Sequence, residues 1–357
     1  MSDQKKQEDV FLSLKKDVEK ADIYNSLKKS DLFKDLSDTE ISTVSLVSTL
    51  HKHPKGTTLF SQGEKASDIY VVVSGSVDVS INQGLEKKLK LGTYKKGEFF
   101  GELAFFLKEI RIGTAITNED TTIVVINNKL YDLPSIFRTQ GFVSFLKIIA
   151  NRASSTLKEI SKSMTRNKNA MLQFMNDFPN TSVEEEGVDK RRQNGNEFLK
   201  IGNLRNLHIF KRFDDESLEK LCAKSYKIDI EKGELLFPEN STGKSFYIIV
   251  SGAILIIKTL EINGEEKHAK IALLPPGRPL GHLSFFDNSE RSASAIACER
   301  TTLMEIELET YTELVCTVGE DTDVAFELLE GFIDDLAVAM VATNRALVYA
   351  SSRAGLT

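Results

Sequence analysis

The chain starts with patterns that predict helices. Apolar residues recur at spacings near three and four between residues 8 and 28, which predicts an amphipathic helix carrying Phe11, Leu14, Val18, Ala21 and Leu27. A second helix is predicted from the capping box Ser37-Asp38-Thr39-Glu40, in which Ser37 caps the helix and Glu40 reaches back to it. After this helix the apolar period changes from helical to alternating.

The alternating segments are short, rich in β-forming residues and separated by glycines. They are Thr57–Phe60, Ile69–Val73, Ser76–Ile81, Lys87–Leu91, Thr114–Thr117 and Thr122–Asn127. Such strands with glycine turns predict a small barrel or jelly roll. The helical pattern returns from Leu133 to about Phe178. Two histidines in HKHPKG, His51 and His53, are interpreted as an exposed turn rather than a metal site.

The second half of the chain repeats the first. Residues 67–75, SDIYVVVSG, align with residues 244–252, KSFYIIVSG, at an offset of 177 that grows to 180 further on. The second copy therefore carries three extra residues, around Ile262–Lys267. A repeat of this size indicates two copies of one domain, so the predicted fold is α+β, with two jelly-roll or barrel domains flanked by helices.

The stretch between the copies is poor in apolar residues and carries mixed charge blocks, which favours a flexible linker. We therefore predict four segments: an N-terminal helical segment at 1–36, a first domain with its C-terminal helices at 37–178, a linker at 179–197, and a second domain with its C-terminal helix at 198–357.

Composition narrows the class of protein. With 357 residues, 41% hydrophobic and 27% charged, the chain can build proper cores, and its net charge of -6 argues against a broad nucleic-acid surface. The cysteines, three in number and unclustered, favour a reducing compartment without disulfides or metal. No signal peptide or membrane-spanning run is recognised, so we expect a cytoplasmic protein.

The stretch Phe100–Thr114, FGELAFFLKEIRIGT, carries two complementary chemistries. Its Gly101–Ala104 segment can turn into a helical start and point backbone N–H groups at an anion, while Arg111 offers a planar fork for phosphate oxygens. Glu102 would repel a phosphate, so it should face a hydroxyl donor on the same ligand, such as a ribose 2′-hydroxyl. A compact nucleotide meets both demands.

This stretch resembles the phosphate-binding cassette of the cyclic nucleotide-binding domain family, found in catabolite activator proteins and protein kinase A regulatory subunits. The family pattern is matched except at Ile110, where a proline is usual, and at Ile112, where a small or hydroxyl residue is common. The resemblance implies cAMP or cGMP as ligand and no cofactor, with cAMP favoured because Ile112 lacks a hydroxyl. The implied binding residues are Gly101, Glu102, Leu103, Ala104, Arg111, Ile112 and Thr114.

The second cassette, Leu280–Ser292, keeps the phosphate half and changes the sugar half, because His282 replaces the glutamate. Its candidate binding residues are Gly281, His282, Leu283, Ser284, Arg291 and Ser292. Three interpretations stay open: weak binding of a cyclic nucleotide, binding of another phosphate ligand, or a structural role without ligand.

In the first domain, the lid over the base should come from the helix after Leu133, with Phe142, Arg152 and Ser155 as loose candidates.

No catalytic constellation is recognised, so we expect a non-enzymatic sensor that relays cyclic nucleotide binding in the first domain, through its helices, to an unknown protein partner. One alternative is a structural adaptor with degenerate nucleotide sites. Another is an inhibitor like a kinase regulatory subunit, although Arg191–Asn194 resembles an inhibitor segment only faintly and lies between the domains. The apolar C-terminal stripe either pairs helices in a homodimer or closes its own barrel. Nucleic-acid and membrane partners are not expected.

Overall fold

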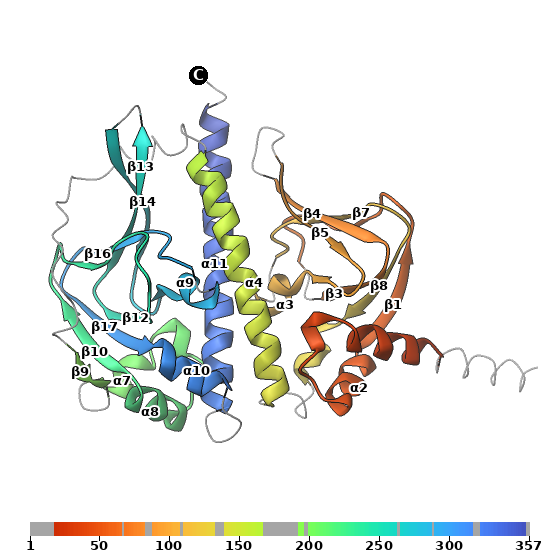
Figure 1. Ribbon diagram of the computed structural model, residues 1–357, viewed down its shortest axis with the longest axis horizontal. Helices are drawn as coiled ribbons and strands as arrows, with labels where there is room; N and C mark the ends of the chain where they lie inside the picture. Colours follow the sequence, from red (N-terminus) through yellow and green to blue (C-terminus); the bar gives the residue numbers. More distant parts are fainter. Residues whose placement is uncertain are drawn as a thin grey trace, which may run out of the picture. The chain divides into compact units, whose positions relative to one another are not determined.

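The computed structural model describes most of the chain as two compact units (Figure 1). They divide between Ile149 and Ala150, inside helix α4 (Gln140–Arg166). The described residues are 18–65, 68–82, 88–107, 110–132, 139–166, 192–195, 199–262, 265–287, 289–316 and 322–354.

Helices lead into the first unit as the apolar pattern predicts. Residues 18–28 are helical, whereas residues 8–17 of the predicted helix lie outside the described residues. Helix α2 (Asp38–Leu46) begins with the predicted capping box, in which the Glu40 N–H donates to the Ser37 hydroxyl and the Ser37 N–H donates to the Glu40 carboxylate. The other elements of this unit are η1 (Asp31–Phe33), β1 (Ser48–His53), β2 (Thr58–Phe60), β3 (Ile69–Ser74), β4 (Ser76–Asn82), β5 (Lys88–Lys95), β6 (Phe99–Phe100), α3 (Glu102–Leu107), β7 (Thr114–Thr117), β8 (Thr121–Ile126) and η2 (Asn128–Asp132).

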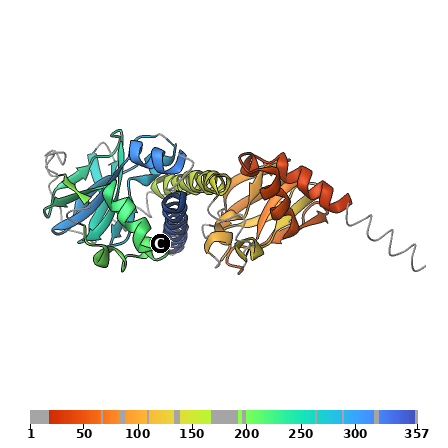
Figure 2. The same ribbon diagram turned by 90° about the horizontal axis from the view of Figure 1, so that it is seen from below.

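The strands of the first unit form two four-stranded antiparallel sheets, ordered β1-β8-β3-β6 and β2-β7-β4-β5. Their inner faces share one core of alternating side chains, among them Val72 on β3, Val77 and Val79 on β4, and Phe100 on β6. In both views the strands fold over one another rather than lying in one flat sheet (Figure 1 and Figure 2). This confirms the predicted jelly-roll type of fold.

The second unit has the same design. Its sheets are ordered β15-β12-β17-β10-β9 and β11-β16-β13-β14. Its elements are β9 (Gln193–Asn194), α7 (Ile201–Leu204), η4 (His208–Phe210), α8 (Asp215–Ala223), β10 (Tyr226–Ile230), β11 (Leu235–Phe237), β12 (Ser245–Ser251), β13 (Ile254–Ile262), β14 (Glu265–Leu274), β15 (Pro279–Leu280), α9 (His282–Asp287), β16 (Ser294–Ala297), β17 (Thr301–Glu307), α10 (Leu308–Cys316) and α11 (Thr322–Ala354).

The backbone confirms the internal repeat. Gly75 and Gly252, which are 177 residues apart, have φ values of 83° and 84°. An added Cβ would lie within 2.5 Å of a threonine hydroxyl on a neighbouring strand, Thr121 on β8 for Gly75 and Thr301 on β17 for Gly252. The close approach of the two strands therefore requires glycine at both positions. At another equivalent turn Gly63 is replaced by Asn240, which keeps a positive φ of 64°.

Two segments differ from the sequence-based expectation. The histidine pair lies in strand β1, not in a turn: β1 pairs with β8, and the rings of His51 and His53 stack at 6.1 Å on one face. The end of the expected linker is also strand, because β9 pairs with β10. Arg192, just before β9, forms ion pairs with Glu307 and with Glu305, whose side chain is only 1% exposed. A buried carboxylate needs such a cation.

The C-terminal apolar stripe packs inside its own unit. Leu328, Leu329 and Phe332 on α11 are fully buried, and α11 contacts η4, α8 and α10. This packing favours the interpretation in which the apolar C-terminal stripe closes its own domain. Side chains beyond Thr343 lie outside the described residues. Each helix among the described residues is too short or too polar to span a bilayer.

Candidate functional site

The first cassette joins strand β6 to helix α3 through Gly101. This residue has a φ of 83°, and an added Cβ would lie 2.8 Å from Nη1 of Arg111 and 3.0 Å from the Tyr70 ring. No side chain fits there, which explains the glycine. Helix α3 then begins at Glu102, as the sequence predicts.

Arg111 is buried, with 1% of its surface exposed, and its side chain links three segments of the first unit. Nη1 donates to the backbone carbonyls of Asp68 and Gly101, both at 2.9 Å, and Nη2 donates to the Tyr70 hydroxyl at 3.2 Å. The guanidinium lies 4.3 Å from the centre of the Phe60 ring. Its Nε–H is buried and has no hydrogen-bond acceptor among the described residues. A donor of this kind fits an anionic ligand.

The other predicted residues of the first cassette have different environments. Glu102 is 4% exposed, and its charge acts on Arg111. Leu103, Ala104 and Ile112 are buried, and they pack rather than project. The Thr114 hydroxyl accepts a hydrogen bond from the Gln62 N–H at 3.0 Å, so it holds a turn. The structure thus brings Gly101, Glu102 and Arg111 together and gives Thr114 a structural contact.

Arg291 repeats the geometry of Arg111 in the second unit. Its Nη1 donates to the Gly281 carbonyl and, at 2.9 Å, to the Ser284 hydroxyl, while Nη2 donates to the Ser245 carbonyl. The guanidinium lies 4.4 Å from the Phe237 ring centre, and its Nε–H is again buried without an acceptor among the described residues. The phosphate half of the cassette is therefore built in the same way in both units.

The sugar half differs in charge. His282 is 5% exposed and stacks parallel to Phe332, with ring centres 5.6 Å apart. Burial lowers the pKa of His282 to about 3, helped by the positive charges of Arg278, Arg291 and Lys158. The imidazole is therefore neutral at physiological pH, where the first cassette places a carboxylate.

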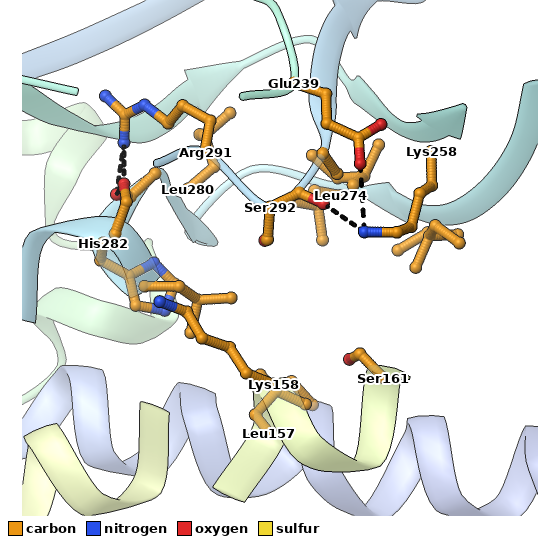
Figure 3. A pocket seen from close by; sticks show the side chains of 18 of the residues that line it. Leu157, Lys158, Ser161, Glu239, Lys258, Leu274, Leu280, His282, Arg291 and Ser292 are labelled. Carbon is orange, nitrogen blue, oxygen red and sulfur yellow. Dashed lines mark hydrogen bonds and ion pairs between the residues drawn. The ribbon is translucent and has the colours of Figure 1, made fainter. Parts of the chain in front are cut away.

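A cavity of about 520 Å³ opens at the second cassette (Figure 3). Gly281, His282, Leu283, Ser284, Arg291 and Ser292, all predicted from the sequence, line it. The opposite wall comes from Leu157, Lys158 and Ser161 on α4, which the sequence did not associate with this cassette. Only their helical spacing is visible in the sequence, and it does not say which domain the helix covers.

Phe142 and Ser155, two of the residues considered as a lid over the base in the first domain, have other environments in the structure. Phe142 is buried and stacks on Phe145 at 4.9 Å, so it belongs to the core. Ser155 is exposed, and its hydroxyl donates to the Asn151 carbonyl. Among the described residues, no group of three metal-ligating side chains gathers in one place.

Comparison with known proteins agrees with this geometry. The family model described as "Cyclic nucleotide-binding domain" matches residues 50–132 and 227–317. A regulatory subunit of cAMP-dependent protein kinase from Mucor circinelloides f. lusitanicus is 23% identical over 290 residues, which cover 81% of this chain and 53% of that protein. The chain thus spans about half the length of that relative.

Two further similarities are shorter or weaker. The cyclic AMP receptor protein of Thermus thermophilus is 36% identical over 84 residues, 24% of this chain and 38% of that protein. The regulatory domain of Toxoplasma gondii PKA, solved with cAMP, covers 85% of this chain and 94% of that one at 17% identity, with a TM-score of 0.30 that supports no conclusion. Two matched segments and two matching cassettes lead to one identification: this chain carries two cyclic nucleotide-binding domains in tandem, related to those of protein kinase A regulatory subunits and CRP-type sensors.

Proposed function

We propose that this chain is a non-enzymatic regulatory protein that binds a cyclic nucleotide, cAMP in preference to cGMP, in its first domain. The observation that carries the proposal is that Arg111 donates to the Gly101 carbonyl at 2.9 Å while the charge of the neighbouring Glu102 acts on its guanidinium. A carboxylate acceptor next to a buried guanidinium matches a ligand with a sugar hydroxyl next to a phosphate.

The phosphate and the ribose of a cyclic nucleotide would each have a partner in this arrangement. The phosphate would be held by Arg111, whose Nε–H is buried without an acceptor among the described residues, and by backbone N–H groups of Gly101–Ala104. The ribose 2′-hydroxyl would donate to Glu102. Ile112 offers no hydroxyl to the base, and this favours cAMP over cGMP.

The signal would leave the first domain through helix α4. The start of this helix is tied to the domain, because the Thr139 hydroxyl donates to the Glu40 carboxylate and accepts from the Phe142 N–H at 3.2 Å. A ligand that favours one arrangement of these helices shifts their population, and a protein partner that recognises the arrangement responds to the shift.

A structural adaptor with degenerate nucleotide sites is one alternative for the whole chain, and the neutral His282 in place of the carboxylate favours it in the second domain. An inhibitor resembling a protein kinase A regulatory subunit is the other alternative for the whole chain, favoured by the Mucor relative that matches 81% of it. Both alternatives act through contacts with another protein.

Thermal unfolding of the full chain with cAMP, cGMP and other cyclic nucleotides tests the proposal. A ligand at a hundred times its Kd adds about 2.7 kcal/mol to the domain that binds it. We expect cAMP to raise the unfolding temperature more than cGMP at equal concentration. If no cyclic nucleotide shifts the transition, the sensor function is wrong and the adaptor remains.

A further inference from the structure

The cavity at the second cassette has the size and lining of a small-molecule site. Its volume of about 520 Å³ falls within the range of roughly 300–1,000 Å³ that is usual for ligand pockets. We propose that the second cassette and helix α4 together bind a nucleotide-sized organic phosphate whose ribose 2′-hydroxyl is not required. This proposal does not depend on ligand binding in the first domain.

The phosphate end is set by Arg291. Two other cations that line the cavity lie against carboxyl groups: Lys258 lies 3.1 Å from Glu239, and Nε of Arg278 lies 2.8 Å from Asp335. The Nη groups of Arg291 instead donate to neutral oxygens, and its buried Nε–H has no acceptor among the described residues. The buried carboxylate whose charge acts on Arg291, that of Glu305, is ion-paired with Arg192 at 2.6 Å. A phosphate at this position would give Arg291 an anionic partner of its own.

The sugar end is set by His282, which lines the cavity where the first cassette has Glu102. A neutral imidazole accepts a weaker hydrogen bond than a carboxylate does, since it carries no negative charge. Three positive side chains, those of Arg278, Arg291 and Lys158, also raise the electrostatic potential around it. A ribose 2′-hydroxyl therefore gains little here, and ligands that lack it should bind equally well.

The organic part of the ligand would lie between the cassette and α4. Apolar side chains from both sides line this part of the cavity, including Leu157 on α4 and Leu274 on β14 (Figure 3). Ile256 on β13 also lines it. Apolar surfaces on both sides suit a base or another ring. The preference is for a ring-bearing phosphate over free inorganic phosphate.

Helix α4 is held against the cassette by two hydrogen bonds. The Lys158 ammonium donates to the Ser289 hydroxyl at 2.6 Å, and the Ser154 hydroxyl donates to the Leu283 carbonyl at 3.2 Å. Leu283, Ser289 and Lys158 all line the cavity, so a ligand in it would touch both surfaces at once. Ligand binding and docking of α4 should therefore stabilise each other.

Calorimetric titration of the full chain with cAMP and 2′-deoxy-cAMP tests this proposal. In an Arg111→Ala chain, which lacks the phosphate partner of the first site, the two Kd values should agree within about threefold. Adding His282→Glu should create a preference of about tenfold or more for cAMP, which is the usual value of a hydrogen bond to a charged group. A tenfold preference already present with His282, or no binding of either ligand, overturns the proposal. Binding of inorganic phosphate as tight as that of cAMP overturns the ring preference.

A second pair of variants tests whether the ligand occupies the cavity, and it leaves the buried arginines unchanged. Ser161→Trp would fill the cavity from α4, whereas Ser155→Trp puts the same side chain on an exposed face of the same helix. Affinity for 2′-deoxy-cAMP should fall at least about tenfold with Ser161→Trp and stay unchanged with Ser155→Trp. Equal affinity in both variants would show that the ligand binds elsewhere and would overturn the assignment.

Discussion

Arg111→Ala is the most informative single substitution, because Arg111 has two roles. It holds the carbonyls of Asp68 and Gly101 and the hydroxyl of Tyr70, and it is the proposed phosphate partner. Losing hydrogen bonds from a charged donor leaves buried acceptors unpaired, while the cost of burying the guanidinium disappears. The two effects together should lower the free energy of unfolding of the first unit by about 2–4 kcal/mol.

The effect on binding is separate from the effect on stability. A phosphate left in a desolvated site without its arginine loses about 2–5 kcal/mol of binding free energy, a factor of about 30 or more in Kd. Urea unfolding of the full chain, with and without cAMP, measures both quantities. In the wild-type chain cAMP at a hundred times its Kd adds about 2.7 kcal/mol to the unit that binds it. At the same cAMP concentration this increment should fall below about 1 kcal/mol for the first unit of the variant.

The second site is the matched control for this experiment. Arg291→Ala should leave the cAMP increment of the first unit in place, because Arg291 makes its contacts within the second unit. The double variant, Arg111→Ala with Arg291→Ala, should show an increment below about 1 kcal/mol in both units. If cAMP stabilises the double variant as much as the wild type, neither arginine is a phosphate partner and the reasoning from the cassettes is refuted.

Three other substitutions test single features of the fold. Arg192→Ala should destabilise the second unit by about 3 kcal/mol in urea unfolding, because it leaves the buried Glu305 without its cation. Burial raises the pKa of Asp335 to about 7 against the opposing charge of Arg278, 2.8 Å away, so the free energy of unfolding should fall as pH rises from about 4 to about 7. Asp335→Asn should flatten the unfolding free energies measured across that range. Gly75→Ala should lower the melting temperature more than Gly56→Ala, because both have positive φ but only Gly75 faces a neighbouring strand within 4 Å. The expectations would be contradicted if Arg192→Ala left the free energy of unfolding unchanged, or if Asp335→Asn left its pH dependence unchanged. The third would be contradicted if Gly75→Ala lowered the melting temperature no more than Gly56→Ala.

Local sequence signals predicted much of the fold. The capping box at Ser37 and Glu40 and the strand Thr114–Thr117 occur as expected, because they depend on neighbours a few residues away. The repeat was visible because the two copies keep the same turn residues, such as Gly75 and Gly252. Strand β1 was missed because polar and charged residues dominate Ser48–His53, so no alternating apolar signal marks it.

The sequence predicted which residues form the candidate site but not which distant residues contact them. The cassette residues could be read from one short stretch, since Gly101, Glu102 and Arg111 are close in sequence. The internal contacts of Arg111 could not, because Asp68 and Tyr70 lie more than forty residues earlier. The wall that α4 gives to the second cavity joins residues about 130 apart, such as Lys158 and Ser289, and no local pattern records such a contact.

The central claim is that Glu102 and Arg111 form a cyclic nucleotide site in the first domain. Titrating the Arg291→Ala chain with cAMP and with 2′-deoxy-cAMP tests it most directly, because only the first cassette keeps its arginine there. A hydrogen bond from the 2′-hydroxyl to the Glu102 carboxylate should make cAMP bind at least about tenfold more tightly. Equal binding of the two ligands, or no binding of either, would contradict the claim.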